Sequence, residues 1–138
     1  MMPVEQTVAA GLLVQDGKIL ITRRDRNRHL ELYWEFPGGK QKKNESVTDC
    51  LIREMEEETG IRVRVGRKIY STSYRYPDRT IRLNFYLCER DFGTTGERRP
   101  SEFRWIGRKE LGHYRFPPAN TPLIRMLMSD ETPVPELD

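Results

Sequence analysis

Apolar residues along the chain fall into short segments whose spacing predicts a series of β-strands. Several segments alternate apolar and polar residues, the period of two that turns one face of a strand toward a core. The alternation is clearest from Ile81 to Leu87, where every second residue is apolar. The predicted strands are 4–14, 18–22, 33–36, two within 61–76 on either side of Gly66, 79–89 and 102–106.

Two segments have the period of an α-helix instead. The first is predicted at 46–59, with Ser46 as its N-cap and Gly60 as its C-terminal cap. The second begins at Asn120 or Thr121 and presents an apolar face to the core. Strands before and after a central helix, with a further helix at the end, predict an α/β fold in which a mixed sheet lies between helices.

Length and composition indicate one domain. A chain of 138 residues, 36% hydrophobic and 33% charged, is large enough for a core and has a well-solvated surface. We expect the domain to span 1–128, and the acidic, proline-containing segment 129–138 to form a flexible C-terminal tail. No apolar run has membrane-spanning length and no signal peptide is visible, so a cytoplasmic protein is expected.

Charge and cysteine content narrow the possible chemistry. The net charge of +3 suits a small anionic substrate but is too weak by itself to indicate nucleic-acid binding. The two cysteines, Cys50 and Cys88, lack metal-binding spacing. Because Cys50 falls on the apolar face of the first helix, a reduced and buried thiol is expected there.

The first helix carries carboxylates where a core-facing helix normally has apolar residues. Its apolar stripe consists of Val47, Cys50, Leu51 and Met55. Glu54 and Glu58 lie on the same stripe, and Glu57 is about 60° from Glu54 around the helix. Buried like charges repel and lose hydration, so a divalent cation with oxygen ligands, such as Mg²⁺, would stabilise them. A solvated run of charges is the alternative, and it explains Glu56 better than Glu54 or Glu58.

The segment 39–61 resembles the Nudix box at all nine positions that define it. These positions are Gly39, Glu45, Arg53, Glu54, Met55, Glu57, Glu58, Gly60 and Ile61. The resemblance to the Nudix family implies an α/β/α sandwich that hydrolyses nucleoside diphosphates linked to a further group. It also implies a metal site in which Glu54, Glu57, Glu58 and the Gly38 carbonyl hold Mg²⁺, with Mn²⁺ as another possible ion.

Segments 35–40 and 116–120 are similar to the MutT-like branch of this family, which removes oxidised guanine nucleotides. In that branch an asparagine reads the edge of the base, and Asn120 matches it. Oxidation at C8 changes N7 of guanine from an acceptor to a donor, so an amide that spans O6 and N7–H would prefer the oxidised base. The alternative role of Asn120 is to cap the second helix, and the two roles are compatible, one through the backbone and one through the side chain.

Four more residues take a role from this resemblance. Arg24 matches a base-contacting arginine, whereas His29 and Arg79 align more loosely as substrate contacts, and an ordinary loop histidine is the alternative for His29. Glu97 falls in the loop that supplies a further metal-binding glutamate, and an exposed loop acid is its alternative. The chain departs from the branch at 42–44, where Lys-Lys-Asn replaces an acid and a glycine, although asparagine tolerates the left-handed turn.

These residues predict a Mg²⁺-dependent nucleoside triphosphate pyrophosphohydrolase that converts 8-oxo-dGTP to the monophosphate and pyrophosphate, and so sanitises the nucleotide pool. Arg53 is expected to orient the glutamates, and Glu54 or Glu97 to take the proton of water. Cytidine triphosphates, RNA 5′-triphosphate ends and a non-hydrolytic damaged-base module stay open as alternatives. The expected partner is a small nucleotide, with no membrane and no nucleic acid other than RNA 5′ ends; monomer and dimer are both open.

Overall fold

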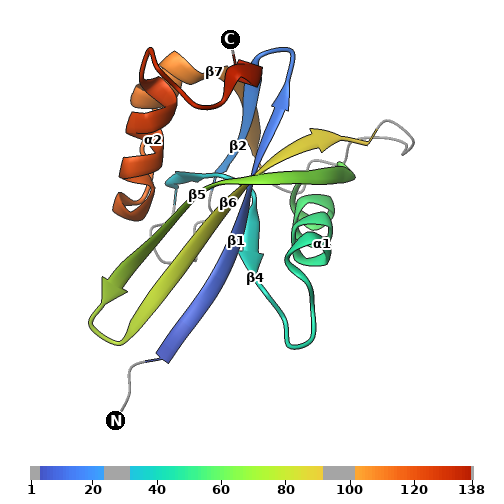
Figure 1. Ribbon diagram of the computed structural model, residues 1–138, viewed down its shortest axis with the longest axis vertical. Coiled ribbons are helices and arrows are strands. Elements are labelled where there is room, and N and C mark those ends of the chain that lie inside the picture. The colour runs from blue at the N-terminus through green and yellow to red at the C-terminus, as the bar shows by residue number, and fades with distance from the viewer. Residues whose placement is uncertain (1–3, 24–31, 92–101, 138) are drawn as a thin grey trace.

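The computed structural model describes residues 4–23, 32–91 and 102–137, which form a mixed β-sheet with helices on both faces (Figure 1). Its strands are β1 (Val4–Gln15), β2 (Lys18–Arg23), β3 (Trp34–Glu35), β4 (Gly38–Lys40), β5 (Val63–Tyr76), β6 (Arg79–Arg90) and β7 (Phe103–Gly107). Its α-helices are α1 (Val47–Thr59) and α2 (Thr121–Met128), and its 3₁₀ turns are η1 (Arg108–His113), η2 (Pro118–Asn120) and η3 (Pro135–Leu137).

Strand β1 is the centre of the sheet. The strand order is β3-β2-β1-β6-β5, with β4 also pairing with β1 and β7 with β2. β1 and β6 run parallel, whereas the other pairs are antiparallel. Residues 9–13 of β1 are buried without interruption, because helices cover the strand on both faces.

Each face of the sheet carries its own apolar core. On the α1 face, Leu13 of β1 packs in one cluster with Leu51 and Met55. On the α2 face, Leu12 and Phe85 share a cluster with residues of α2 such as Leu123. Figure 1 shows the two helices on opposite sides of the sheet, so the predicted α/β/α sandwich is confirmed.

Two strands differ from the sequence prediction. Segment 61–76 forms one long strand, β5, in which the register with β6 shifts between Val65 and Lys68 and again before Tyr70. A strand with such irregularities resembles two short ones in sequence, because the alternation is interrupted. β4 was not predicted, because its sequence Gly-Gly-Lys has a low β-propensity and pairs with β1 only in the tertiary structure.

The C-terminal residues 129–137, which we name the C-terminal strap, are packed rather than flexible. Val134 and Leu137 are 0% and 6% exposed and belong to the α2-side core. Arg67 of β5 binds the Glu136 carboxylate through two nitrogens at 2.8 and 3.1 Å. The predicted flexible tail is therefore wrong over this segment: its acids and prolines suggested solvation, but two isolated apolar residues fasten it to the core.

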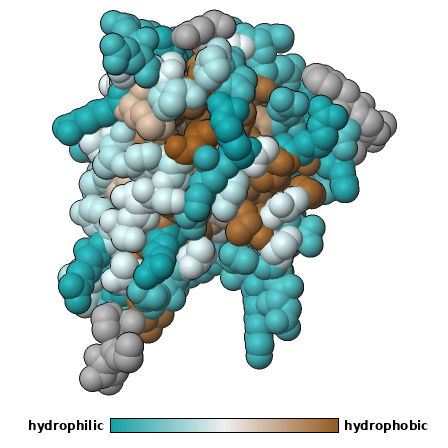
Figure 2. Space-filling model, viewed as in Figure 1, coloured by the Kyte–Doolittle hydropathy of each residue, from teal (hydrophilic) through white to brown (hydrophobic). Residues whose placement is uncertain are grey.

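The described surface is mainly polar. Val4 is the one large apolar residue classed as exposed in the ranges given above. Figure 2 shows polar side chains over most of the visible face, with apolar residues gathered near its middle. None of the helices in the described part of the chain is long and apolar enough to cross a membrane.

Candidate active site

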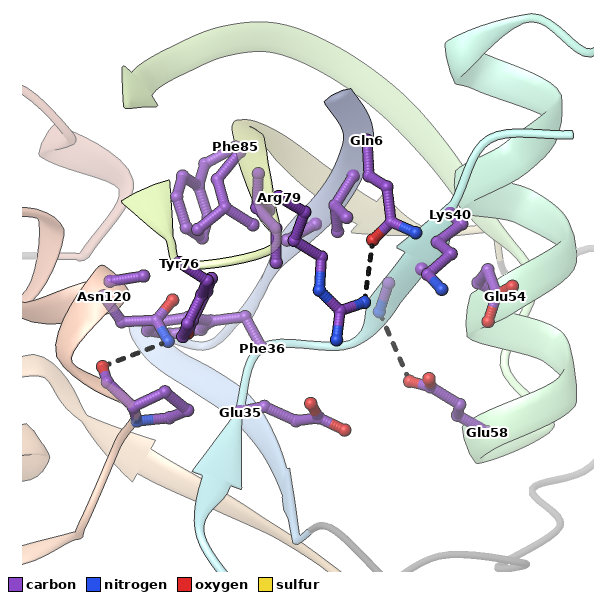
Figure 3. A pocket seen from close by; sticks show the side chains of 18 residues that line it. Gln6, Glu35, Phe36, Lys40, Glu54, Glu58, Tyr76, Arg79, Phe85 and Asn120 are labelled. Atoms are coloured by element: carbon purple, nitrogen blue, oxygen red, sulfur yellow. Dashed lines mark hydrogen bonds between the residues drawn. The ribbon is translucent and has the colours of Figure 1, made fainter. Parts of the chain in front are cut away.

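A cavity of about 500 Å³ lies between α1, the sheet and the turn η2 that precedes α2. Its lining is Gln6, Val8, Ala10, Glu35, Phe36, Gly38, Gly39, Lys40, Glu54, Glu58, Tyr76, Arg79, Ile81, Leu83, Phe85, Pro117, Ala119 and Asn120. Figure 3 shows Glu54, Glu58 and Lys40 on one side of this space and Asn120 with Tyr76 on the other. An apolar floor with charged groups at one side and an amide at the other has the size and character of a small-molecule site.

Helix α1 brings its glutamates to this cavity. The Ser46 hydroxyl accepts a hydrogen bond from the Asp49 N–H at 3.0 Å, and Gly60 adopts a left-handed φ of 76° at the other end, so both predicted caps are confirmed. The buried side of the helix holds it on the sheet through Cys50, Leu51 and Met55. The same docking places Glu54 and Glu58 of that stripe at the wall of the cavity.

Arg53 gathers three glutamates around one guanidinium group. It donates to both Glu45 oxygens at 2.8 and 2.9 Å, and to Glu54 Oε1 at 2.7 Å. Glu57 Oε2 lies 3.5 Å from Arg53 Nη1. The Arg53 hydrogen bonds, helped by the Lys42 backbone N–H, lower the pKa of Glu45 to about 2. The hydrogen bonds that Arg53 donates to Glu45 and Glu54 raise the pKa of the guanidinium in turn. Arg53 and Glu45 therefore stay ionised, and the Arg53 guanidinium holds Glu54 in one orientation.

Two glycines let β4 approach the helix and the central strand closely. A Cβ at Gly38 would overlap the Ala9 carbonyl oxygen, and a Cβ at Gly39 would lie 2.5 Å from the Glu54 carboxyl carbon. The Gly38 N–H also donates to Glu58 Oε2 at 3.3 Å. The backbone contact at Gly38 leaves no room for a side chain, whereas a side chain at Gly39 would displace the Glu54 carboxylate. Both glutamates therefore lie against the backbone of β4.

Asn120 lies at the opposite side of the cavity and is 9% exposed. It occupies the N-cap position of α2, but its side chain makes no capping hydrogen bond. Its amide instead donates to the Pro117 carbonyl oxygen at 3.5 Å, a long contact (Figure 3). The alternative role of Asn120 as a side-chain helix cap is therefore not what the structure shows.

Several lining residues were missed in the sequence. Gln6 lies two and four residues before Val8 and Ala10, so the alternation of β1 puts all three on the face that lines the cavity. This alternation is the sequence signal that indicates its position. Lys40 follows the two glycines directly and extends toward the glutamates (Figure 3). Glu35 and Tyr76 lack such a signal, because they come from β3 and the end of β5 and meet only in the tertiary structure.

Both cysteines are buried free thiols, which confirms the prediction made for Cys50. Burial, assisted by the nearby negative charge of Glu45, raises the pKa of the Cys50 thiol to about 11. Burial alone raises the pKa of Cys88 to about 12. Cys50 lies directly behind β4, where its thiol donates to the Gly39 carbonyl oxygen at 3.7 Å.

Comparison with known proteins places these features in a family. The model of the NUDIX domain matches residues 8–126, which include the cavity's main walls and the whole of α1. The chain belongs to the Nudix family. It is 35% identical to the 8-oxo-dGTP diphosphatase of Escherichia coli K12, over 87% of this chain and 94% of that protein. It is 32% identical to the CTP pyrophosphohydrolase of the same organism, over 88% and 90% of the two chains.

A solved structure gives the same assignment. The solution structure of a MutT protein of the Nudix hydrolase family from Staphylococcus aureus 252 superimposes with a TM-score of 0.69. The two are 33% identical, and the match covers 92% of this Nudix chain and 98% of the other. The resemblance to Nudix hydrolases and to the MutT-like branch is thereby confirmed, and hydrolases of this family generally need divalent metal ions.

The Nudix box residues are only partly gathered at the cavity. Glu54, Glu58 and Gly38 line it together, and their oxygens are the ligand type that Mg²⁺ prefers. Glu57 is outside the lining with its side chain 59% exposed, although it shares the guanidinium of Arg53. Within the residues described, no three His, Cys, Asp or Glu side chains form a ready metal site. The oxygen donors of Glu54, Glu58 and Gly38 therefore fit a divalent cation, but the Glu57 side chain does not line the cavity.

The other predicted site residues divide into two groups. Arg79 lines the cavity and Asn44 adopts the expected left-handed conformation, with φ of 64°. Arg24, His29 and Glu97 lie outside the described residues, so their predicted contacts stay predictions.

Proposed function

We propose that this Nudix hydrolase is a Mg²⁺-dependent pyrophosphohydrolase that acts on 8-oxo-dGTP in the cytoplasm and releases 8-oxo-dGMP and pyrophosphate. The observation that carries the substrate is the Asn120 amide, which lines the cavity without capping α2. An amide offers a donor and an acceptor side by side. Guanine has acceptors at both O6 and N7, whereas the oxidised base presents an acceptor at O6 and a donor at N7, which match the amide. The E. coli 8-oxo-dGTP diphosphatase supports the same substrate by similarity.

The side of the cavity opposite Asn120 supplies the chemistry. Glu54, Glu58 and the Gly38 carbonyl would hold the cation, with Glu57 and Glu97 as the predicted further ligands. When bound, the cation neutralises phosphate charge and lowers the pKa of a coordinated water. Arg53 fixes the orientation of Glu54. The Lys40 ammonium group, which lines the cavity, would bind a phosphate oxygen. Glu54 or Glu97 takes the proton of the attacking water.

A nucleotide panel tests this proposal. The kcat/KM of the wild type is measured on 8-oxo-dGTP, dGTP, CTP, dCTP and an RNA with a 5′-triphosphate, with and without Mg²⁺. Preference for 8-oxo-dGTP over dGTP supports the proposal, and its absence refutes the substrate. Preference for CTP is the second candidate outcome, because the relative that is a CTP pyrophosphohydrolase matches this chain almost as well. Tight binding of 8-oxo-dGTP without turnover would indicate a non-hydrolytic module.

Asn120→Ala tests the residue that carries the substrate assignment. Loss of a buried hydrogen-bonded pair costs about 1–3 kcal/mol for each partner left unsatisfied, so preference for 8-oxo-dGTP should fall by about ten- to a few hundred-fold. Activity on dGTP should change much less, because the glutamates are at the other side of the cavity. Thr121→Ala, an exposed neighbour in the same turn, is the matched control and should keep the preference. An equal loss on both nucleotides in Asn120→Ala would contradict the role.

A further inference from the structure

One face of the β1–β6 pair forms the floor of the cavity, and its polarity changes along the strands. The parallel register places Val8 beside Leu83 and Ala10 beside Phe85, and all four residues line the cavity. One step further toward the start of β1, Gln6 pairs with Ile81 on the same face. The apolar floor therefore ends in an amide, at a position where the alternation of β1 would continue with an apolar residue.

Gln6 contacts the second polar residue at this end of the floor. Arg79 pairs with Val4, two residues before Gln6, so Gln6 and Arg79 are diagonal neighbours on one face of the sheet. Arg79 Nη1 donates to Gln6 Oε1 at 3.3 Å (Figure 3). Arg79 Nε also lies 3.6 Å from Asp78 Oδ1. The Asp78 side chain is 74% exposed, whereas Gln6 lines the cavity, so Gln6 contacts the guanidinium from within the cavity wall.

We propose that Gln6 is a positioning residue, which fixes the Arg79 guanidinium at the rim of the cavity for binding an acceptor oxygen of the nucleotide. The proposal rests on the proposed function in taking a nucleotide as the ligand. The Arg79 guanidinium has five N–H donors, so after it donates to Gln6 it still has donors for a ligand. A long side chain that is already ordered loses less entropy when it binds, so Gln6 acts on affinity rather than on the chemical step.

The test separates affinity from chemistry. Gln6→Leu keeps the approximate size but removes the acceptor, and it should raise KM by about three- to tenfold while kcat stays within about twofold. The matched control is Glu5→Leu, which removes a contact of the same length between the same strands, from Glu5 to Arg82 at 3.3 Å, outside the cavity lining. Glu5→Leu should leave both constants unchanged. An equal rise of KM in both variants would mean that strand stability alone is responsible, and would overturn the proposal.

A double-mutant cycle then tests whether Gln6 acts through Arg79. If it does, adding Gln6→Leu to Arg79→Ala causes no further rise in KM. A full additional rise, an unchanged KM in Gln6→Leu, or a loss confined to kcat would each refute the positioning role.

The cycle is measured on whichever nucleotide of the panel the wild type hydrolyses, and as the Kd of 8-oxo-dGMP and CMP without metal. If 8-oxo-dGTP fails as the substrate but the coupling appears with CTP or CMP, the substrate assignment is wrong and the role of Gln6 stands. If neither monophosphate binds and no nucleotide is hydrolysed, both are overturned.

Discussion

Replacing Gly39 by alanine introduces one methyl group at the contact between β4 and α1. The added Cβ would lie 2.5 to 2.7 Å from the carboxyl carbon and both oxygens of Glu54. Ordinary van der Waals contact begins at about 3.4 Å, so the carboxylate must retreat by about 0.9 Å. Glu54 is also bound to Arg53 at 2.7 Å, so a retreat stretches or breaks that ion pair.

The cost is expected in catalysis rather than in folding. A displacement of about 1 Å in a group that must be placed accurately reduces the rate by about 10²-fold, equivalent to about 2.7 kcal/mol of transition-state stabilisation. The free energy of unfolding should change little, because the side chain that must move is partly exposed at the cavity wall. Alanine also restricts the unfolded chain, which offsets part of any strain.

The assay is Mg²⁺-dependent release of pyrophosphate from the preferred nucleotide, measured beside the melting temperature. Gly112→Ala is the control, because its Cβ would meet only the flexible end of Met128, at 3.2 Å, away from the cavity. It should keep full activity. A Gly39→Ala protein with kcat/KM within about threefold of wild type would show that Glu54 does not need this position.

Three further changes test other parts of the molecule. Glu58→Gln keeps an acceptor for the Gly38 N–H but removes a negative charge from the predicted metal site. Turnover should fall by at least about 10²-fold while the melting temperature stays unchanged. Titrating activity with Mg²⁺ in the wild type and the variant measures the loss. The pKa of Glu45 is lowered to about 2, so its bond to Arg53 should stabilise the protein fully above about pH 4.5 and progressively less as the pH falls toward 2. Urea unfolding of the wild type and Glu45→Gln should therefore show the difference between their free energies of unfolding shrink over this range. A difference that stays constant with pH would contradict the role. Leu137→Ala should lower the free energy of unfolding by about 2–3 kcal/mol and the melting temperature by about 10 °C. A flexible strap predicts no change in either quantity.

Local patterns predicted the parts of the site that lie on α1. Ser46, Gly60 and the apolar stripe define the helix through neighbours three and four residues apart, so the sequence contains nearly all of the information. The positions of Glu54 and Glu58 follow from the same period. The orientation of Glu57 does not, because its side chain turns toward Arg53 rather than into the cavity, and that choice depends on ion pairing.

Features that depend on distant partners were harder to predict. β4 exists because Gly38 to Lys40 pair with β1, about thirty residues earlier in the chain, and glycines carry no signal for it. The C-terminal strap was misread because its composition is polar, while its packing depends on Val134 and Leu137 alone. Gln6 is a polar residue near a chain end, and such residues are ordinarily solvated, so its polarity gives no indication that it lines the cavity.

The burial of Cys50 behind β4 provides a built-in reporter of motion at the site. With its thiol pKa near 11, only about one molecule in 10⁴ carries the reactive thiolate at neutral pH, even before access is considered. Because Cys50 is buried, a thiol reagent reacts with it only when α1 moves away from the sheet. The labelling rate of this thiol measures the free energy of that local opening, without an added probe and without unfolding the rest of the molecule. Ligands that draw the glutamates of α1 toward β4 should slow it, so nucleotide and metal binding can be followed through a residue that touches neither.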